Sequence, residues 1–320
     1  MSESAALFDR GAWRAHRARA ARGGSVDFLH EEVAERLIDR LDLVNRQFSC
    51  VLDLGARGGG LTRALSRRRG VAWVVAAEPA VGFLRHLGSV ASAKAGVQGD
   101  HAAPALGSRS RGNDGSTLHG VVADPELLPF ADASFDLVVS NLVLHWAGDL
   151  PGVLVQLRRA LKPDGLLLAA MLGGQTLIEL RTALFEAELA EEGGVSPRVS
   201  PAVTLADVAA LLQRAGFALP VADSETITVS YRDMLALLRD LRGMGEQNAL
   251  AARRRAPLRR ATLAHAAELY AARFGDADGR VAATFEVLFL CGWAPAPEQP
   301  QPLPRGSARM RLADALKPPD

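Results

Sequence analysis

Cysteine is scarce in this chain, and neither net charge nor long apolar runs are in excess. Cys50 and Cys291 are the only thiols among 320 residues, which argues against a disulfide scaffold and for a reducing compartment. The formal net charge is +1, which argues against binding to nucleic acid or a membrane surface through overall charge. No run reaches the roughly 18 consecutive apolar residues of a membrane span. We also expect no signal peptide, because an apolar leader region is missing.

Signatures of metal and nucleophile chemistry are missing as well. The seven histidines are scattered along the chain, and neither a Cys-x-x-Cys pair nor a Gly-x-Ser-x-Gly elbow occurs. We therefore expect no metal centre. Because 48% of the residues are hydrophobic, the chain is nevertheless able to bury a large core.

What the chain does contain is an apolar strand that runs into a glycine-rich turn and then a helix, over residues 51–66. This order builds nucleotide sites in open α/β sheets, because glycine lets the backbone approach a ligand and the new helix points free N–H groups at it. Arg57 stands where a second glycine would be expected, which is tolerable if its backbone stays outside the left-handed region. The alternative is an ordinary turn whose glycines only pack. The predicted cofactor-binding residues here are Asp53, Gly55, Ala56 and Gly59.

Two further carboxylates follow predicted strands. Glu78 ends the second strand, and an acid at about this distance from the turn can accept hydrogen bonds from both hydroxyls of a ribose. Asp124 follows the third strand, where it can accept from the amino group of a base between apolar neighbours. The alternatives are a solvated acid and an aspartate that helps the Asp124–Pro125 turn. We favour cofactor binding, because ligands of such sheets gather at the carboxyl ends of the strands.

The fourth predicted strand also ends in polar groups. Asn141 follows it directly, and His145 and Trp146 come shortly afterwards. We expect these side chains to border the substrate side, with Asn141 also a candidate cofactor contact. Asn141 and His145 are the candidate catalytic residues, with His145 as a proton acceptor. The alternative is that His145 only packs beside Trp146 with one hydrogen bond.

Strands and helices alternate over most of the chain, which is typical of a doubly wound α/β sheet. Apolar or alternating runs predict seven strands, at residues 51–54, 71–77, 120–123, 135–140, 166–171, 225–231 and 284–291. Helical patterns cover residues 28–43, 81–87, 151–161, 176–191 and 205–215, and a helical insertion, 232–282, separates the last two strands. We expect those two strands to pair as a hairpin-like unit.

The chain divides into a basic arm with a helical cap (1–44), a cofactor-binding domain (45–294) and a proline-rich tail (295–320). Residues 10–22 carry five arginines and no acid, as a mitochondrial presequence can, but the nearby acids Glu3 and Asp9 favour a solvated basic helix or arm. Residues 88–117 are small and polar, which predicts a long irregular insertion. Gly243 and Gly245 interrupt a helical region, which predicts either a lid near the cleft or a plain turn between helices.

Taken together, these residues resemble the class I S-adenosylmethionine-dependent methyltransferases. The resemblance rests on Asp53-Leu54-Gly55, Glu78, Asp124 with Leu128-Pro129-Phe130, Phe135–Ser140 and Leu161–Gly165, in that order. It implies a mostly parallel, seven-stranded, Rossmann-like sheet that binds S-adenosyl-L-methionine. It also implies that Gly55 and Gly59 line the methionine part of the cofactor, Glu78 the ribose and Asp124 the adenine.

A narrower resemblance covers nearly the whole chain. Its blocks include Phe8–Arg10, Phe28–Val33, Leu144–Trp146, Gly173–Leu177, Asp240–Asn248 and Arg305–Ala308. They are similar to the complex I assembly factors that hydroxylate an arginine on a quinone-module subunit, and malonyl-carrier-protein methyltransferases of biotin synthesis share fewer of them. This resemblance implies that subunit of the NADH dehydrogenase as partner and peripheral association with the inner-membrane complex. It implies a location in the bacterial cytoplasm or the mitochondrial matrix.

Three functions are compatible with this resemblance. The first is a protein-arginine hydroxylase in which Glu179 or Glu246 pairs with a guanidinium; S-adenosylmethionine is a methyl donor, so the source of the oxygen stays open. The second is a methyltransferase for a small molecule or a carrier-protein thioester, which needs mainly proximity and in-line geometry. The third is a non-catalytic assembly chaperone whose basic arm and tail contact partners.

Overall fold

The computed structural model describes residues 6–87, 90–92, 110–111, 117–300 and 307. Most of the predicted insertion at 88–117 lies outside these residues, so its irregularity stays a prediction. The parts of it that are described are two short strands at one edge of the sheet, β3 (Val90–Ser92) and β4 (Ser110–Arg111). The sheet therefore extends further at this edge than the sequence indicated.

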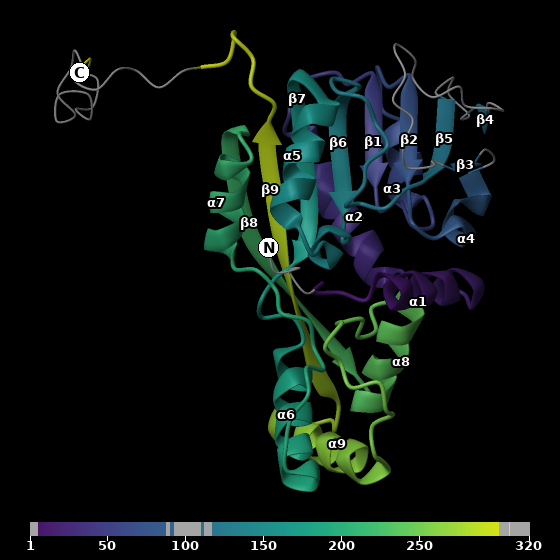
Figure 1. The fold of residues 1–320 in the computed structure, drawn as a ribbon, viewed down its shortest axis with the longest axis vertical. Coiled ribbons are helices and arrows are strands. Elements are labelled where there is room, and N and C mark those ends of the chain that lie inside the picture. The colour runs from purple at the N-terminus through teal and green to yellow at the C-terminus, as the bar shows by residue number, and fades with distance from the viewer. Residues whose placement is uncertain (1–5, 88–89, 93–109, 112–116, 301–306, 308–320) are drawn as a thin grey trace.

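One mixed sheet forms the centre of the molecule (Figure 1). Its order is β3-β5-β2-β1-β6-β7-β9-β8, with β4 paired to β5 outside this path. Its main strands are β1 (Cys50–Leu54), β2 (Trp73–Ala77), β5 (Thr117–Val122), β6 (Phe135–Asn141), β7 (Leu161–Leu172), β8 (Ala218–Tyr231) and β9 (Val281–Trp293). Neighbours from β3 to β7 pair parallel along this order, whereas β9 is antiparallel to both β7 and β8. The predicted α/β class with a late antiparallel pair is confirmed.

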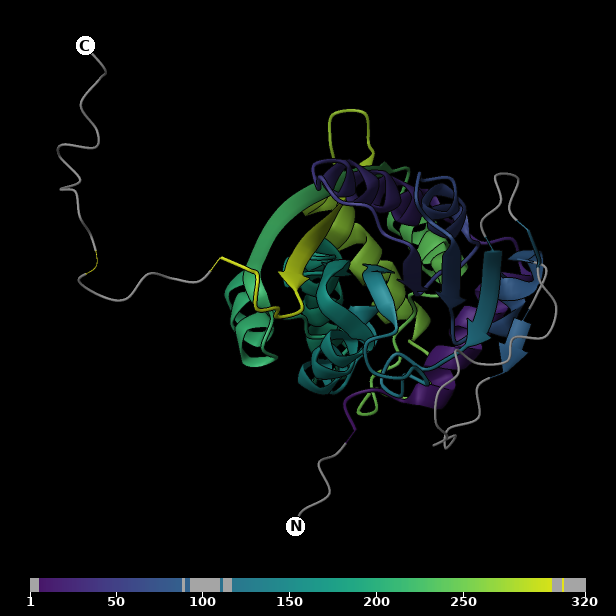
Figure 2. The same cartoon turned by 90° about the horizontal axis from the view of Figure 1, so that it is seen from above.

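Helices cover both faces of the parallel part of the sheet (Figure 2), which explains why the central strands β1 and β2 are mostly buried and apolar. Val51 joins the core under α2 and α3, while its neighbour Leu52 joins the core under α5 and α7. Each covering helix turns an apolar stripe inward, as Val33, Leu37 and Leu41 do on α2. The covering helices are α2 (Phe28–Asp42), α3 (Gly60–Ser66), α5 (Leu150–Ala160) and α7 (Leu205–Arg214), with the short α4 (Val81–Leu84), η1 (Arg85–Leu87) and η2 (Leu144–Trp146) at the strand ends.

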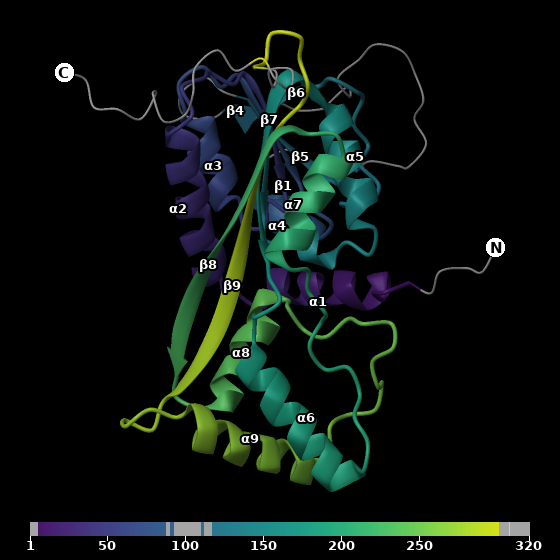
Figure 3. The same cartoon turned by 90° about the vertical axis from the view of Figure 1, so that its left-hand side faces the viewer.

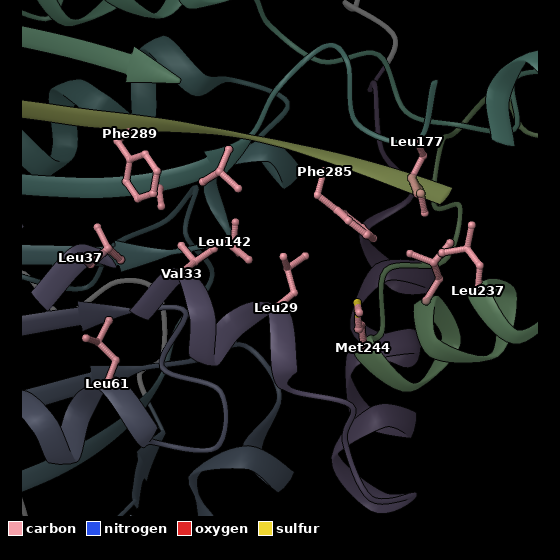
Figure 4. Packing of buried hydrophobic residues seen from close by; sticks show 14 of the residues in the cluster. Leu29, Val33, Leu37, Leu61, Leu142, Leu177, Leu237, Met244, Phe285 and Phe289 are labelled. Carbon is pink, nitrogen blue, oxygen red and sulfur yellow. The ribbon is translucent and has the colours of Figure 1, made fainter. Parts of the chain in front are cut away.

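Strands β8 and β9 continue past the other strands and carry a second, helical layer (Figure 3). The helices of this layer are α6 (Ile178–Glu192), α8 (Met234–Met244) and α9 (Arg260–Phe274). Figure 4 shows that the core continues into this layer, from Leu29 on α2 past Phe285 on β9 to Leu177, Leu237 and Met244. The predicted insertion between the last two strands, which contains α8 and α9, therefore shares one core with the sheet.

The basic arm forms a helix, α1 (Arg10–Arg22), but the expectation of a solvated helix was wrong. The helix lies between the sheet and the insertion helices (Figure 1). Its residues Trp13, Arg17 and Ala20 are buried because their spacing puts them on one face. Figure 1 also shows that α1 lies at the carboxyl ends of the parallel strands.

The compact body also extends further along the chain than expected. Gln299 is buried and donates to Asp164 Oδ1 at 2.8 Å and to the Ala294 carbonyl at 2.9 Å, so residues at the start of the predicted tail still pack on the body. The rest of the tail lies almost wholly outside the described residues. No helix within the described ranges combines the length and apolarity needed to cross a membrane.

Candidate active site

The turn after β1 has a backbone that glycine accepts most easily. Gly55 has φ +83° and Gly59 has φ +77°, both in the left-handed region. A Cβ on Gly55 would lie 2.7 Å from the Cβ of Val143, so a larger residue does not fit there. The amides of Gly55 and Ala56 donate to the Ala77 carbonyl at 2.8 and 3.3 Å, which holds the turn against the end of β2. The glycine-rich turn is therefore a tightly constrained piece of backbone.

We expect Gly55→Ala to lower the free energy of unfolding by about 2–4 kcal/mol, because it adds backbone strain to a steric clash. Gly60→Ala is the matched control: Gly60 begins α3, lies outside the left-handed region and has open space where the methyl group of an alanine would lie. The control should be neutral or slightly stabilising, since alanine is the better helix former. Thermal unfolding of both variants checks this, and equal midpoints would contradict the argument.

Arg57 adopts the left-handed region, with φ +47°, so the expectation that its backbone would stay outside was wrong. Its amide donates to Glu78 Oε2 at 3.2 Å. Its guanidinium donates to the Met244 carbonyl at 2.6 Å and the Val26 carbonyl at 3.1 Å, and it pairs with Asp27. These bonds offset a backbone strain of about 1–3 kcal/mol. They also tie the turn to α8 and to the start of α2.

Asp53 is fully buried and holds α3 against β1. Thr62 donates to its Oδ2 at 2.6 Å, and its Oδ1 has no hydrogen-bond partner in the described part of the chain. Burial raises the pKa of Asp53 to about 7, against the opposing effect of the Thr62 bond and with a further contribution from Glu78. A direct contact between Asp53 and a cofactor stays a prediction.

Glu78, at the end of β2, is fully buried and accepts four hydrogen bonds. Arg17 donates from Nε to Oε1 at 3.0 Å and from Nη2 to Oε2 at 2.7 Å. The amides of Arg57 and Ala80 donate to the same carboxylate at 3.2 and 3.1 Å. A ribose offers a similar pair of donors through its neighbouring hydroxyls. Arg17 therefore occupies the two carboxylate oxygens of Glu78 that we predicted to accept from the ribose hydroxyls.

Asp124 is held by two more arginines of α1. Arg14 Nη2 donates to Oδ2 at 2.7 Å, Arg10 pairs with Oδ1, and the Glu126 amide donates at 3.0 Å. Burial by itself would raise the pKa of Asp124, but these three donors hold it below its ordinary value. Arg10, Arg14 and Arg17 are spaced four and three residues apart, so one face of α1 reaches both carboxylates. That spacing is a signal in the sequence that our interpretation of a solvated helix missed.

Asn141, at the end of β6, has one polar atom bonded and one not. Its Nδ2 donates to the His30 carbonyl at 2.9 Å, while its buried Oδ1 has no partner among the residues described. Both ring nitrogens of His30 are likewise unpartnered, and burial, with the charges of Arg57 and Arg17, lowers the pKa of His30 well below its ordinary value. Unpartnered buried polar atoms of this kind mark places where a ligand supplies the bond. No pattern in the sequence singles out His30.

His145 and Trp146 meet a carboxylate from the insertion. Glu246 Oε2 accepts from Trp146 Nε1 at 2.8 Å and lies 3.1 Å from His145 Nε2. The Glu246 side chain is only 8% exposed, and its Oε1 is buried without a hydrogen-bond partner within the described ranges. Burial would raise the pKa of Glu246, but the charges of His145 and Arg17 hold it below its ordinary value, so the group is a carboxylate. Gly245, the left-handed C-cap of α8, turns the chain just before this acid.

A cavity of about 850 Å³ opens beside these residues, between β9, α6 and α8. Leucines from α6 and α8 make much of its wall, and Glu246, His145 and Trp146 line it as well. Its volume suits a long side chain or a short peptide segment. Glu179, the other acid considered for a guanidinium, does not line the cavity; it accepts the Thr284 amide at 3.2 Å and pairs with the Thr284 hydroxyl.

The residues at the strand ends fit S-adenosylmethionine in kind. Glu78 and Asp124 are acceptors for a diol and an amino group, and Gly55 lets the backbone come close. Asn141 Oδ1 is an acceptor with no donor in the part of the chain that the structure describes. When bound, the cofactor supplies a sulfonium methyl group. Within the described residues, no group of three or more histidine, cysteine, aspartate or glutamate side chains could hold a metal ion.

The chain is similar to several known proteins. Residues 52–169 match the family model described as a methyltransferase domain. The chain is 40% identical to the mitochondrial arginine-hydroxylase NDUFAF5 of Danio rerio over 291 residues. This alignment covers 91% of this chain and 83% of that protein. The human protein of the same name is 38% identical over 314 residues, covering 97% and 84%. The chain belongs to the family of these arginine-hydroxylases.

The arginine-hydroxylase family shares its fold with methyltransferases. A malonyl-[acyl-carrier protein] O-methyltransferase of Methylovorus is 35% identical to this chain over 321 residues, covering 99% of this chain and 96% of that protein. The solved structure of the YcgJ protein from Bacillus subtilis matches with a TM-score of 0.51 at 14% identity, covering 82% and 99%, which shows the fold alone. The chain is thus an enzyme of the methyltransferase fold with S-adenosyl-L-methionine as its cofactor, as the resemblance implied.

Proposed function

We propose that this protein hydroxylates an arginine side chain on a protein partner, with S-adenosylmethionine bound at the carboxyl ends of β1 and β2. The observation that carries the proposal is Glu246. Its Oε1 is a buried, charged acceptor that no donor among the described residues reaches, and the residue lines a cavity that can admit a long side chain. A guanidinium is the side chain best suited to such a carboxylate, because it donates through several N–H groups in a fixed plane.

The residues around Glu246 hold it ready for this role. Trp146 and His145 engage Oε2 and so fix the direction of the carboxylate. The apolar wall, which includes Leu29 and Leu241, packs against the stem of an entering arginine and excludes water, which strengthens the ion pair. His145 Nδ1 is buried and unpartnered in the described structure, so it is a second polar atom that a bound substrate can contact.

The partner that we propose is a quinone-module subunit of the respiratory NADH dehydrogenase, reached by peripheral association with the inner-membrane complex. The proposed location is the bacterial cytoplasm or the mitochondrial matrix. Two features support it: the relatives named above are mitochondrial arginine-hydroxylases, and both cysteines described here are unpaired thiols, which suits a reducing compartment.

Intact-mass analysis of the proposed partner tests this function. The partner is isolated from cells with and without this gene, because the cell supplies the oxidant. A mass that is greater by one oxygen atom in the presence of the gene supports hydroxylation. A gain of one methyl group overturns it in favour of methyl transfer, the activity named for the malonyl-carrier-protein relatives. No mass change, together with complex assembly that fails only in the cells without the gene, favours a non-catalytic chaperone.

We expect Glu246→Gln to weaken the binding of an arginine-containing peptide roughly tenfold to hundredfold, since it removes one charge from a charge-assisted hydrogen bond. The variant keeps the shape of the side chain and an oxygen that can accept from Trp146. Fluorescence anisotropy with a labelled peptide measures the effect. A peptide with citrulline in place of arginine is the control and should bind both proteins equally; a matching loss for both peptides would show a structural role instead.

A further inference from the structure

The wall of the cavity around Glu246 carries an excess of positive charge. A site built only to take a guanidinium would be acidic throughout, because like charges oppose the entry of a cation. The charged lining consists instead of five arginines against two carboxylates: Arg181, Arg198, Arg232, Arg239 and Arg242 against Asp233 and Glu246. Charge complementarity therefore favours a substrate that brings negative charge as well as an arginine.

Two of these arginines are already neutralised. Arg198 pairs with Glu188 at 2.5 Å, and Arg232 pairs with its neighbour Asp233 at 2.9 Å. Glu188 lies on α6 and is buried, so the Arg198 pair also holds the loop after α6 in place. The charge of each of these two arginines is therefore already balanced by a carboxylate of the protein.

The other three arginines form no ion pair in the described structure. Arg181 donates to the carbonyls of Gly174 and Thr176 at 3.3 and 3.5 Å, and Arg239 donates to the carbonyl of Leu235 at 3.2 Å. Arg242 lies in the last turn of α8, where a cation interacts favourably with the helix dipole. The guanidinium groups of Arg239 and Arg242 are thus available to carboxylates from outside.

The two exposed arginines stand at a defined interval from Glu246. Arg239 and Arg242 are three residues apart on α8 and so lie on one face, toward the end of the helix where Glu246 follows. Helix α8 rises roughly 7.5 Å from Arg239 to its last residue, Met244, and Glu246 follows just beyond the left-handed turn at Gly245. An extended peptide advances about 3.3 Å per residue, so this length corresponds to roughly two to three peptide residues.

We propose that this cavity selects an extended peptide in which the reacting arginine has acidic residues two and three positions away on one side. The inference rests on the proposed function, because it takes Glu246 as the acceptor of the arginine. Carboxylates at those positions meet Arg242 and Arg239, which both line the cavity with Glu246. A peptide with further basic residues is repelled by the same arginines.

Peptide binding tests the selection. Each labelled peptide has a central arginine, with aspartate or asparagine two and three residues away from it, either on the N-terminal or on the C-terminal side. Fluorescence anisotropy measures the affinity of each peptide for the full-length protein. We expect Kd to rise roughly fivefold for each aspartate that is replaced by asparagine on the preferred side. The preference should shrink as salt is raised, because exposed charges are screened.

Variants of the protein place the effect on α8. Arg239→Ala together with Arg242→Ala should lower the affinity for the acidic peptide to that of the neutral peptide and leave the neutral peptide unaffected. Both side chains are exposed, so the variant keeps its fold. Arg214→Ala, at an exposed position on α7 outside the cavity, is the control and should change neither affinity.

The outcomes separate this inference from the function on which it rests. Equal binding of the acidic and neutral arginine peptides, or a preference that survives the double substitution, overturns the charge selection and leaves the proposed function standing. If the arginine peptides bind no better than their citrulline counterparts, Glu246 is not the arginine acceptor. In that case the proposed function fails, and the charge selection fails with it.

Discussion

Arg17→Ala and Glu78→Ala should destabilise the cofactor-free protein by similar amounts and then respond to S-adenosylmethionine in opposite ways. The two side chains form a buried ion pair, with exposures of 1% and 0%. Removing either partner leaves the other charge buried and uncompensated, which costs about 3–5 kcal/mol. Stability in the absence of cofactor therefore does not distinguish the two variants.

The cofactor distinguishes them, because only one variant keeps the acceptor. In Arg17→Ala, the carboxylate of Glu78 still accepts from the amides of Arg57 and Ala80 and is open to the ribose hydroxyls. In the parent, the cofactor has to displace Arg17 first, which lowers its apparent affinity by the fraction of molecules in which Glu78 is released. We expect Kd for S-adenosylmethionine to be at least about tenfold lower in Arg17→Ala than in the parent. In Glu78→Ala we expect no cofactor-induced rise in Tm.

Thermal unfolding with and without cofactor, together with titration calorimetry, measures both effects. Arg19→Ala is the control, since Arg19 is exposed on the same helix. Among the residues described, its side chain donates a hydrogen bond only to Gln247, at 2.9 Å. Arg17→Met keeps more of the side-chain volume if the alanine variant unfolds. An equal gain from cofactor in both variants would show that Glu78 does not hold the ribose. An equal loss would make Arg17 a part of the cofactor site.

The second large effect is a pH dependence that Asp53→Asn removes. The pKa of Asp53 is raised to about 7 in the folded protein, against an ordinary value of 3.8. Between these values the folded state keeps a proton that the unfolded chain releases, so the stability of the parent falls as pH rises from about 4 to 7. Below about pH 4 both states are protonated, and above about pH 7 both are ionised. The difference amounts to about 4 kcal/mol across this window.

Asparagine does not titrate and keeps an oxygen that can accept from Thr62. The free energy of unfolding of Asp53→Asn should therefore rise relative to the parent by about this amount between pH 4 and 7. Urea unfolding at several pH values checks it. Asp124→Asn gives a control of opposite sign: the pKa of Asp124 is lowered, so the parent should lose stability relative to that variant as pH falls into the acid range. A flat difference for Asp53→Asn would contradict its buried, raised pKa.

Local patterns in the sequence are enough to locate the strand ends and the acids that follow them. Residues 51–54 and 135–140 are predicted as strands because apolar runs of this length suit a sheet covered on both faces, and β1 and β6 contain them. Gly55 stands out because a strand that turns straight into a helix needs a positive φ, and it has one. Glu78 and Asp124 follow neighbouring strands, so a parallel sheet has to place them at one edge.

The hydrogen-bond and ion-pair partners of those acids could not be predicted from local patterns. Arg17 and Glu78 are 61 residues apart in sequence, and Glu246 is 101 residues from His145. Periodicity describes one element at a time, so it indicates that α1 is a helix without indicating what its arginine face covers. The conformation of Arg57 was missed for a related reason, because its strain is offset by bonds to distant segments.

By itself, the sequence determined the α/β sheet, the tight turn after the first strand and the row of acids beyond the next strands, because each follows from residues close together in the chain. The tertiary structure decided that α1 neutralises Glu78 and Asp124, that Glu246 meets His145 and Trp146, and that arginines line the adjoining cavity. Those contacts join elements that are far apart in the chain, and they form only when the shared core of sheet and insertion helices brings the elements together.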